Sequence, residues 1–152
     1  MTPTLLGRIQ SRLWLLFIVG GVVTLFVASW FESIQFGTFG IPFVVLFWVA
    51  LIGIGWDVIY DQVQKRRWDS DWPPAYQLLS GIAEGILAYL LIKSGLLPGV
   101  PEALPGWMFW THYSLVWFWT FVASQSLMRV LFPQWRFRGG QFGRHPAPRR
   151  GA

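Results

Sequence analysis

Five ionisable side chains interrupt the long apolar stretches of this 152-residue chain: Asp57, Glu84, Lys93, His112 and Arg129. An ionised group in hydrocarbon is costly unless it is paired or faces water. Residues of this kind bind ions, relay protons or hold helices together. They are therefore the candidate functional residues.

Their positions along the expected helices predict which of them meet. With a rise of 1.5 Å per residue, Asp57 and Arg129 lie about 5 Å inside the same membrane face, where opposite charges can pair. Glu84 lies at about 12 Å and Gln125 at about 10 Å, so these two can share a hydrogen bond. Gln125 and Arg129 are four residues apart and share a helix face. We predict one polar cluster of Asp57, Glu84, Gln125 and Arg129 in the cytoplasmic half.

Glu84 stands beside a stripe of small residues, Gly81, Gly85 and Ala88. Small residues at this spacing let another helix approach closely. We expect Glu84 to face protein and to hold helices together, as a protonated or arginine-paired residue. The alternatives are a proton or cation relay and a contact with a partner subunit.

His112 is the one histidine within an apolar stretch, and aromatic residues surround it. A neutral imidazole there could ligate haem iron or chlorophyll magnesium. A bis-histidine haem needs a second ligand, and His145, the other histidine, lies in the opposite tail. We favour an interfacial histidine that is hydrogen-bonded near an outer loop, and we expect no resident cofactor or metal.

The elements that position these residues are four apolar stretches, at about 13–30, 41–60, 76–97 and 107–132. About 20 apolar residues cross a bilayer as a helix. The composition is 54% hydrophobic and 12% charged. These observations predict an all-α integral membrane protein, an up-down-up-down bundle of four transmembrane helices over 13–132. A basic segment, 1–12, precedes it, and a basic tail, 133–152, that we expect to be flexible follows it.

The distribution of Lys and Arg predicts the orientation. Basic residues flank the stretches on one side, whereas the connections 31–40 and 98–106 contain none. Both termini should therefore be cytoplasmic or stromal, in a bacterial inner membrane or a thylakoid. We expect anionic lipid or an acidic partner, rather than nucleic acid, to contact the basic loop and tail: Lys65, Arg66, Arg67, Arg136, Arg138, Arg144, Arg149 and Arg150.

Several classes of chemistry lack their residues here. The chain has no cysteine, so it forms no disulfide or thiolate metal site. It carries no nucleotide-binding loop, zinc-protease helix or nucleophile elbow. We therefore expect that the protein is not an enzyme.

The sequence therefore favours an accessory or scaffold subunit of a larger membrane complex, such as a bioenergetic or photosynthetic one, whose partners are other membrane subunits. One alternative is a small oligomeric proton- or cation-coupled transporter or channel that uses Glu84 and Asp57. A second alternative is a haem- or chlorophyll-binding protein that uses His112.

Overall fold

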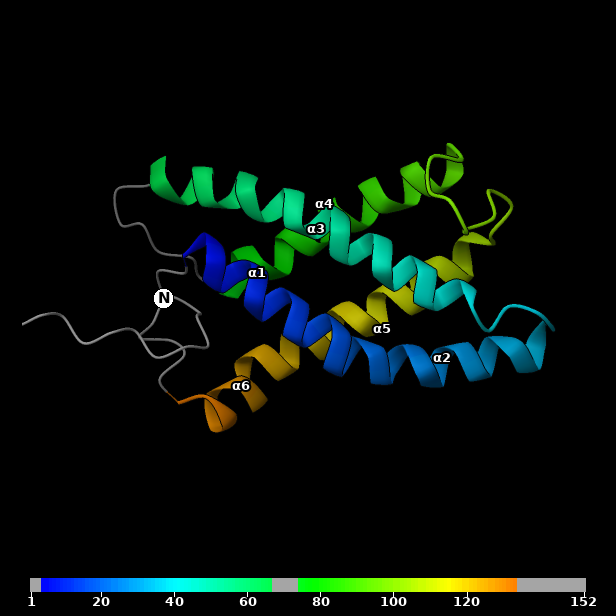
Figure 1. Cartoon of the computed structure of the whole chain (residues 1–152), viewed down its shortest axis with the longest axis horizontal. Helices are drawn as coiled ribbons and strands as arrows, with labels where there is room; N and C mark the ends of the chain where they lie inside the picture. Colours follow the sequence, from blue (N-terminus) through cyan, green and yellow to red (C-terminus); the bar gives the residue numbers. More distant parts are fainter. Residues whose placement is uncertain (1–3, 67–73, 134–152) are drawn as a thin grey trace, which may run out of the picture.

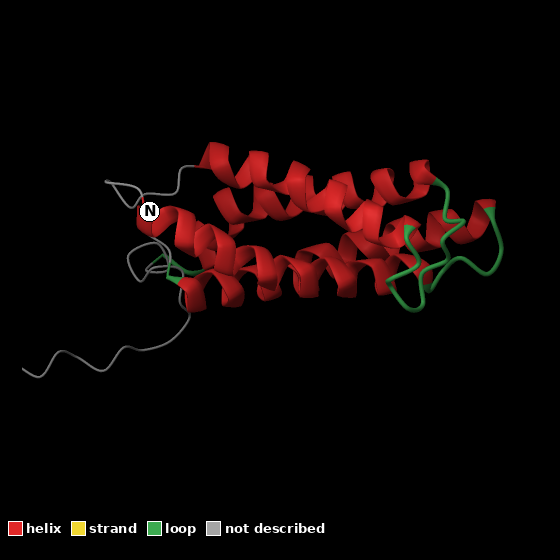
Figure 2. Ribbon diagram, turned by 90° about the horizontal axis from the view of Figure 1, so that it is seen from above, coloured by secondary structure: helices red, strands yellow, loops and turns green. Residues whose placement is uncertain are grey.

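The computed structural model describes residues 4–66, 74–133 and no others. Within these ranges the chain is helical and forms no strand. Its long helices lie alongside one another, and successive ones run in opposite directions (Figures 1 and 2). The all-helical class is as predicted.

The first helix is continuous from Leu5 to Ile34 but contains three segments: α1 (Leu5–Trp14), the π-helix η1 (Leu15–Gly20) and α2 (Gly21–Ile34). Thr4 begins it as an N-cap, because its side-chain oxygen accepts a hydrogen bond from the Gly7 amide at 3.1 Å. The helix extends beyond the predicted apolar stretch, 13–30, at both ends. Residues 5–12 of the predicted basic segment are helical.

The π segment changes which faces of α1 and α2 point inward. In a regular α-helix, at about 100° per residue, Arg12 and Thr24 would point about 120° apart. Both side chains nevertheless bond to other helices: Arg12 to α3 and Thr24 to α5. The wider π turns lie between these two residues and reset the rotation.

The second long helix, α3 (Ile41–Arg66), follows a short turn. Glu32 closes this turn, because its carboxylate accepts hydrogen bonds from the amides of Gly37 at 2.9 Å and Phe39 at 2.7 Å. Pro42 stands in the first turn of α3, where a missing N–H costs nothing. The helix passes the predicted end at 60 and reaches the basic residues Lys65 and Arg66.

The remaining helices are α4 (Pro74–Lys93), α5 (Gly106–Gln125) and the short α6 (Leu127–Leu131). α4 ends four residues before the predicted limit of 97, at a turn in which Gly95 has a φ of +72°. Lys93 tethers the following connection by donating to the carbonyls of Glu102 and Leu104. The fourth predicted stretch breaks at Ser126, which separates α5 from α6.

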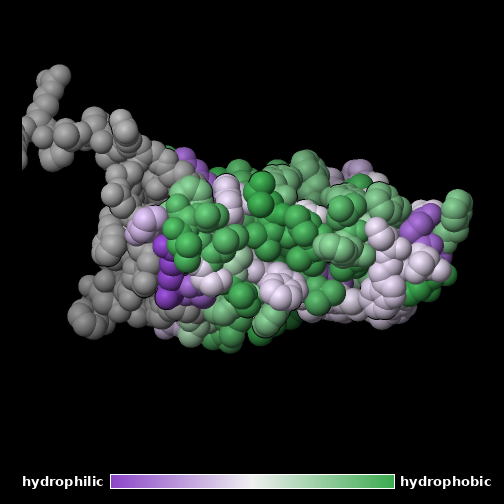
Figure 3. Space-filling view, turned by 90° about the horizontal axis from the view of Figure 1, so that it is seen from below, coloured by the Kyte–Doolittle hydropathy of each residue, from purple (hydrophilic) through white to green (hydrophobic). Residues whose placement is uncertain are grey.

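Three helices within the described residues are long and apolar enough to cross a membrane: Leu5–Ile34, Ile41–Arg66 and Ala75–Lys93. On the face in Figure 3, hydrophobic residues cover the middle of the molecule and hydrophilic ones lie towards its two ends. α5 also has 20 residues, rich in aromatic, serine and threonine residues, and it is not one of these three.

Apolar and polar interiors occupy different halves. The largest apolar core lies towards the connections 35–40 and 94–105, and it includes Phe31, Val45, Ile92, Met108 and Phe109. The other half, where α1 begins and α3 ends, contains buried charged side chains, among them Asp57, Asp61 and Glu84.

Candidate functional site

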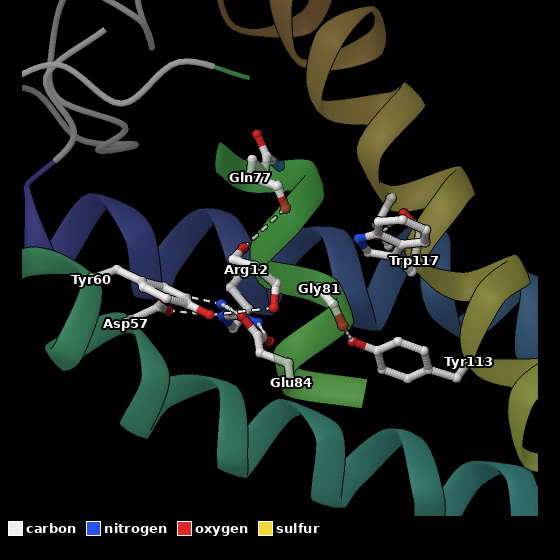
Figure 4. Close-up of polar contacts among 10 residues, drawn as sticks. Arg12, Asp57, Tyr60, Gln77, Gly81, Glu84, Tyr113 and Trp117 are labelled. Carbon is white, nitrogen blue, oxygen red and sulfur yellow. Dashed lines mark hydrogen bonds and ion pairs between the residues drawn. The ribbon is translucent and has the colours of Figure 1, made fainter. Parts of the chain in front are cut away.

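The site centres on Arg12, whose guanidinium binds two carboxylates from two other helices (Figure 4). Its Nε donates to Asp57 Oδ2 and its Nη2 to Asp57 Oδ1, both at 2.9 Å. Nη1 donates to Glu84 Oε2 at 2.8 Å and Nη2 to Glu84 Oε1 at 3.1 Å. Arg12 therefore joins α1 to both α3 and α4.

The three side chains are largely enclosed. Their exposed fractions are 19% for Arg12, 4% for Asp57 and 8% for Glu84. A planar guanidinium matches carboxylates in this two-bond geometry, which gives both orientation and strong charge-assisted hydrogen bonds. One positive and two negative groups leave a formal charge of −1 when both carboxylates are ionised.

A glycine makes room for this arrangement. A Cβ added at Gly53 would lie 2.5 Å from Arg12 Nη1, which is closer than real contacts allow. Gly53 is one turn before Asp57 on α3, so the guanidinium lies directly against the α3 backbone at this level. A side chain at position 53 would displace the Arg12 guanidinium.

A second polar layer lies between the network and the end of the bundle. Arg8, one turn before Arg12, donates to Gln64 Oε1. Asp61 is buried and pairs with Lys65 at 2.6 Å. α1 and the last turns of α3 are thus joined by polar side chains as well as by the Arg12 network.

The predicted cluster of Asp57, Glu84, Gln125 and Arg129 does not form as one unit. Asp57 and Glu84 share Arg12, whereas Arg129 Nη2 donates to Gln125 Oε1 at 2.7 Å. The predicted pairings of Asp57 with Arg129 and of Glu84 with Gln125 are therefore wrong. Depth estimates place residues along the membrane normal but do not tell which helices are neighbours.

Gln125 belongs instead to a small polar group between α4 and α5. Its Nε2 lies 3.5 Å from Gln77 Oε1 and 3.2 Å from Ser124 Oγ. Gln77 Nε2 in turn donates to Ser124 Oγ at 3.3 Å. Long distances between neutral partners make this a weaker contact than the Arg12 network.

The small residues of α4 lie against aromatic side chains of α5. A Cβ at Gly81 would overlap the indole of Trp117, and one at Gly85 would lie 2.5 Å from Tyr113 Cε1. Tyr113 Oη also donates to the Gly81 carbonyl at 2.6 Å (Figure 4). Ala88, the third member of the stripe, is buried. These positions allow large rings to lie directly on the α4 backbone.

His112 lies in the other half of the molecule, where 3% of it is exposed. Its Nε2 is 2.9 Å from Thr24 Oγ1 on α2. The ring is thus enclosed, with one nitrogen already bonded.

Of the residues expected to contact anionic lipid or partners, the structure describes Lys65 and Arg66. Lys65 pairs with Asp61, and Arg66 is exposed. The others, Arg67, Arg136, Arg138, Arg144, Arg149 and Arg150, lie outside the described residues. Among residues 4–66 and 74–133, no three side chains of His, Cys, Asp or Glu are placed to hold a metal ion.

The sequence did not single out Arg12 as a functional residue. Arg12 is one of the basic residues that flank the apolar stretches and that were used only to predict orientation. Two carboxylates inside apolar stretches, with Arg8 and Arg12 one helical turn apart beside the first stretch, were the available signal.

Comparison of the chain with protein-family models, with curated protein sequences and with solved structures finds no match.

Proposed function

We propose that this protein crosses a membrane four times, through α1–η1–α2, α3, α4 and α5, with both termini on the cytoplasmic or equivalent side. Three of these helices have the required length and apolarity. α5 packs along the first helix and α4, and a helix in that position spans the same thickness. The one-sided Lys and Arg residues support the orientation.

Within that membrane domain, the protein acts as an accessory or scaffold subunit of a larger assembly, such as a bioenergetic or photosynthetic complex. The supporting observation is that Arg12 engages both buried carboxylates, Asp57 and Glu84. Charged groups used in this way fix the relative positions of three helices. A rigid bundle with an apolar exterior is suited to packing against other membrane subunits.

The outward face of α5 is the surface that we assign to a partner subunit. Its exposed residues include Trp107, Trp110, Ser114, Phe118 and Trp119. This face combines large aromatic rings with a hydroxyl, whereas the exposed face of α3 is mainly aliphatic, with Leu51, Val58 and Ile59. Aromatic residues are enriched in the cores of protein interfaces.

Purification through an affinity tag in mild detergent tests this function. We expect other membrane proteins to co-purify in fixed proportion. The double substitution Phe118→Leu/Trp119→Leu should reduce their yield, whereas Phe47→Leu, an equally exposed position on α3, should not. Recovery of the protein alone, colourless and without transport activity, would rule out the accessory role.

The excess carboxylate of the Arg12 network favours a second candidate, a small oligomeric proton- or cation-coupled transporter or channel. Two carboxylates share one guanidinium, so Glu84 or Asp57 could accept a proton or a cation in exchange for part of its contact with Arg12. The purified protein would then be a homo-oligomer. Reconstituted in vesicles, it would show a pH-dependent flux of protons or cations. Glu84→Gln should abolish this flux while the fold remains intact.

A further inference from the structure

A cavity beside His112 lies at the opposite end of the molecule from Arg12. Its walls come from α2, α3, α5 and both neighbouring connections, and they include Phe31, Ile41, Val45, Leu104, Phe109 and His112. Apart from His112 and Thr38, these walls are apolar. The cavity volume is about 10 Å³. A single water molecule needs about 10–15 Å³ on the same scale, so the space takes no more than one water-sized group, either a water molecule or the oxygen end of a molecule that enters from the open side.

His112, which lines this cavity, carries an unmatched polar atom. Its Nδ1 is buried and has no hydrogen-bond partner in residues 4–66 and 74–133. Its other ring nitrogen, Nε2, is bonded to Thr24, which does not line the cavity. A buried polar atom without a partner costs free energy comparable to a lost hydrogen bond, so a partner is expected.

The hydroxyl of Thr24 decides which kind of partner Nδ1 needs. Thr24 is fully buried, and its contact with His112 Nε2 is the one hydrogen bond of its side chain within the described chain. If Thr24 donates to Nε2, the neutral ring carries its proton on Nδ1, and that N–H alone is left without a partner. The reverse assignment leaves two groups unmatched, the Thr24 hydroxyl proton and the Nδ1 lone pair. The first arrangement is therefore the more stable.

We infer that the cavity beside His112 binds one neutral hydrogen-bond-accepting oxygen, which receives the proton of Nδ1. Apolar walls exclude an anion or a metal ion, whereas they suit a water molecule or the carbonyl end of a small lipid-soluble molecule. Both sources offer the same acceptor chemistry. Neither depends on the Arg12 network or on the proposed function.

Nuclear magnetic resonance of the full chain in detergent micelles, with ¹⁵N-labelled histidine, tests the inference. The background substitution His145→Asn leaves His112 as the single histidine. We expect a protonated Nδ1 and an unprotonated Nε2. Magnetisation transfer from water to the Nδ1 proton would identify water as the oxygen. A shift of that proton on addition of cyclopentanone, but not of cyclopentane, would identify a carbonyl site.

A protonated Nε2 with a bare Nδ1 would overturn the inference, as would an Nδ1 proton that responds to neither water nor cyclopentanone. Thr24→Val keeps the side-chain shape but removes the donor, so the preference for the Nδ1 proton should be lost. Thr120→Val is the control, because Thr120 bonds to the Trp117 carbonyl on α5 and does not contact His112. It should leave the ring protonation unchanged.

Discussion

Arg12 and Asp57 are 45 residues apart in sequence, yet they are joined by two parallel N–H···O bonds of 2.9 Å each. This geometry places the guanidinium plane in line with the carboxylate and leaves Nη1 and part of Nη2 for Glu84. The first helix, α3 and α4 are thus held in register by one side chain.

Replacing Arg12 with Met should destabilise the protein by about 3–5 kcal/mol, because two buried carboxylates would lose their common partner. The measurement is the free energy of unfolding in mixed micelles. Arg66→Met removes an exposed arginine from the end of α3 and should have little effect. Equal losses in the two variants would show that Arg12 acts only through overall charge.

Much of the unfolding free energy lost in Arg12→Met should be recovered without restoring any ion pair. In the triple variant Arg12→Met/Asp57→Asn/Glu84→Gln, no charge remains in the network, so the desolvation cost disappears together with the attraction. We expect its unfolding free energy to lie well above that of Arg12→Met alone. A triple variant as unstable as the single one would mean that the guanidinium acts mainly through packing.

Glu84→Gln should cost less than Arg12→Met, because Arg12 and Asp57 remain as a neutral pair with both of their hydrogen bonds. The amide oxygen of glutamine can still accept from Arg12 Nη1. A loss of about 1 kcal/mol is expected for the weakened charge-assisted bond. Unfolding of Glu84→Gln and Asp57→Asn, singly and together, measures the coupling; additive losses would contradict a shared network.

The difference between the predicted and observed clusters has a physical origin. The length of the apolar stretches predicts that they form helices. The structure confirms three helices that are long and apolar enough to cross a membrane. The depths predicted for Asp57 and Glu84 put both residues in the same half of the helices. Which residue each carboxylate binds depends instead on which helices are neighbours and on how each helix is rotated about its axis. The π segment η1 changes that rotation between Arg12 and Thr24, and no periodic pattern in the sequence reveals it.

The composition of α5 also limits what the sequence can predict. Tryptophan and tyrosine are amphipathic. α5, which contains Trp107, Trp110, Tyr113, Trp117 and Trp119, is not among the three helices long and apolar enough to cross a membrane, although it packs along apolar neighbours. The contact of its rings with Gly81 and Gly85 explains why glycine occurs there. The sequence indicated close approach at this stripe, but it did not indicate which side chains make that approach.

Gly81→Ala should destabilise the protein by about 1–3 kcal/mol, since its Cβ would overlap the Trp117 indole. Gly55→Ala on α3 is the matched control, because a Cβ at Gly55 meets nothing within 4 Å. That control should be neutral or stabilising by about 0.5–1 kcal/mol, as expected for glycine to alanine in a helix. Thermal unfolding in one detergent compares the two.

A compensating change tests whether overlap is the cause. Trp117→Phe shortens the ring that faces Gly81, so Gly81→Ala should cost less in that background than in the native chain. Non-additivity of this kind is expected only for side chains in contact. Strictly additive losses would place the effect of Gly81→Ala elsewhere in the fold.

The proposed fourth crossing can be tested with single cysteines, because the native chain contains none. Glu102 is exposed in the connection before α5, and Val130 is 77% exposed on α6 after it. If α5 crosses the membrane, Glu102→Cys should react with a membrane-impermeant maleimide in intact spheroplasts, and Val130→Cys only after permeabilisation. Arg66→Cys should behave like Val130→Cys, since both lie on the side with the basic residues.

The native protein should remain unlabelled, and labelling after denaturation should show equal amounts of each variant. Reaction of both Glu102→Cys and Val130→Cys in intact cells, with Arg66→Cys protected, would place α5 outside the membrane and reduce the crossings to three.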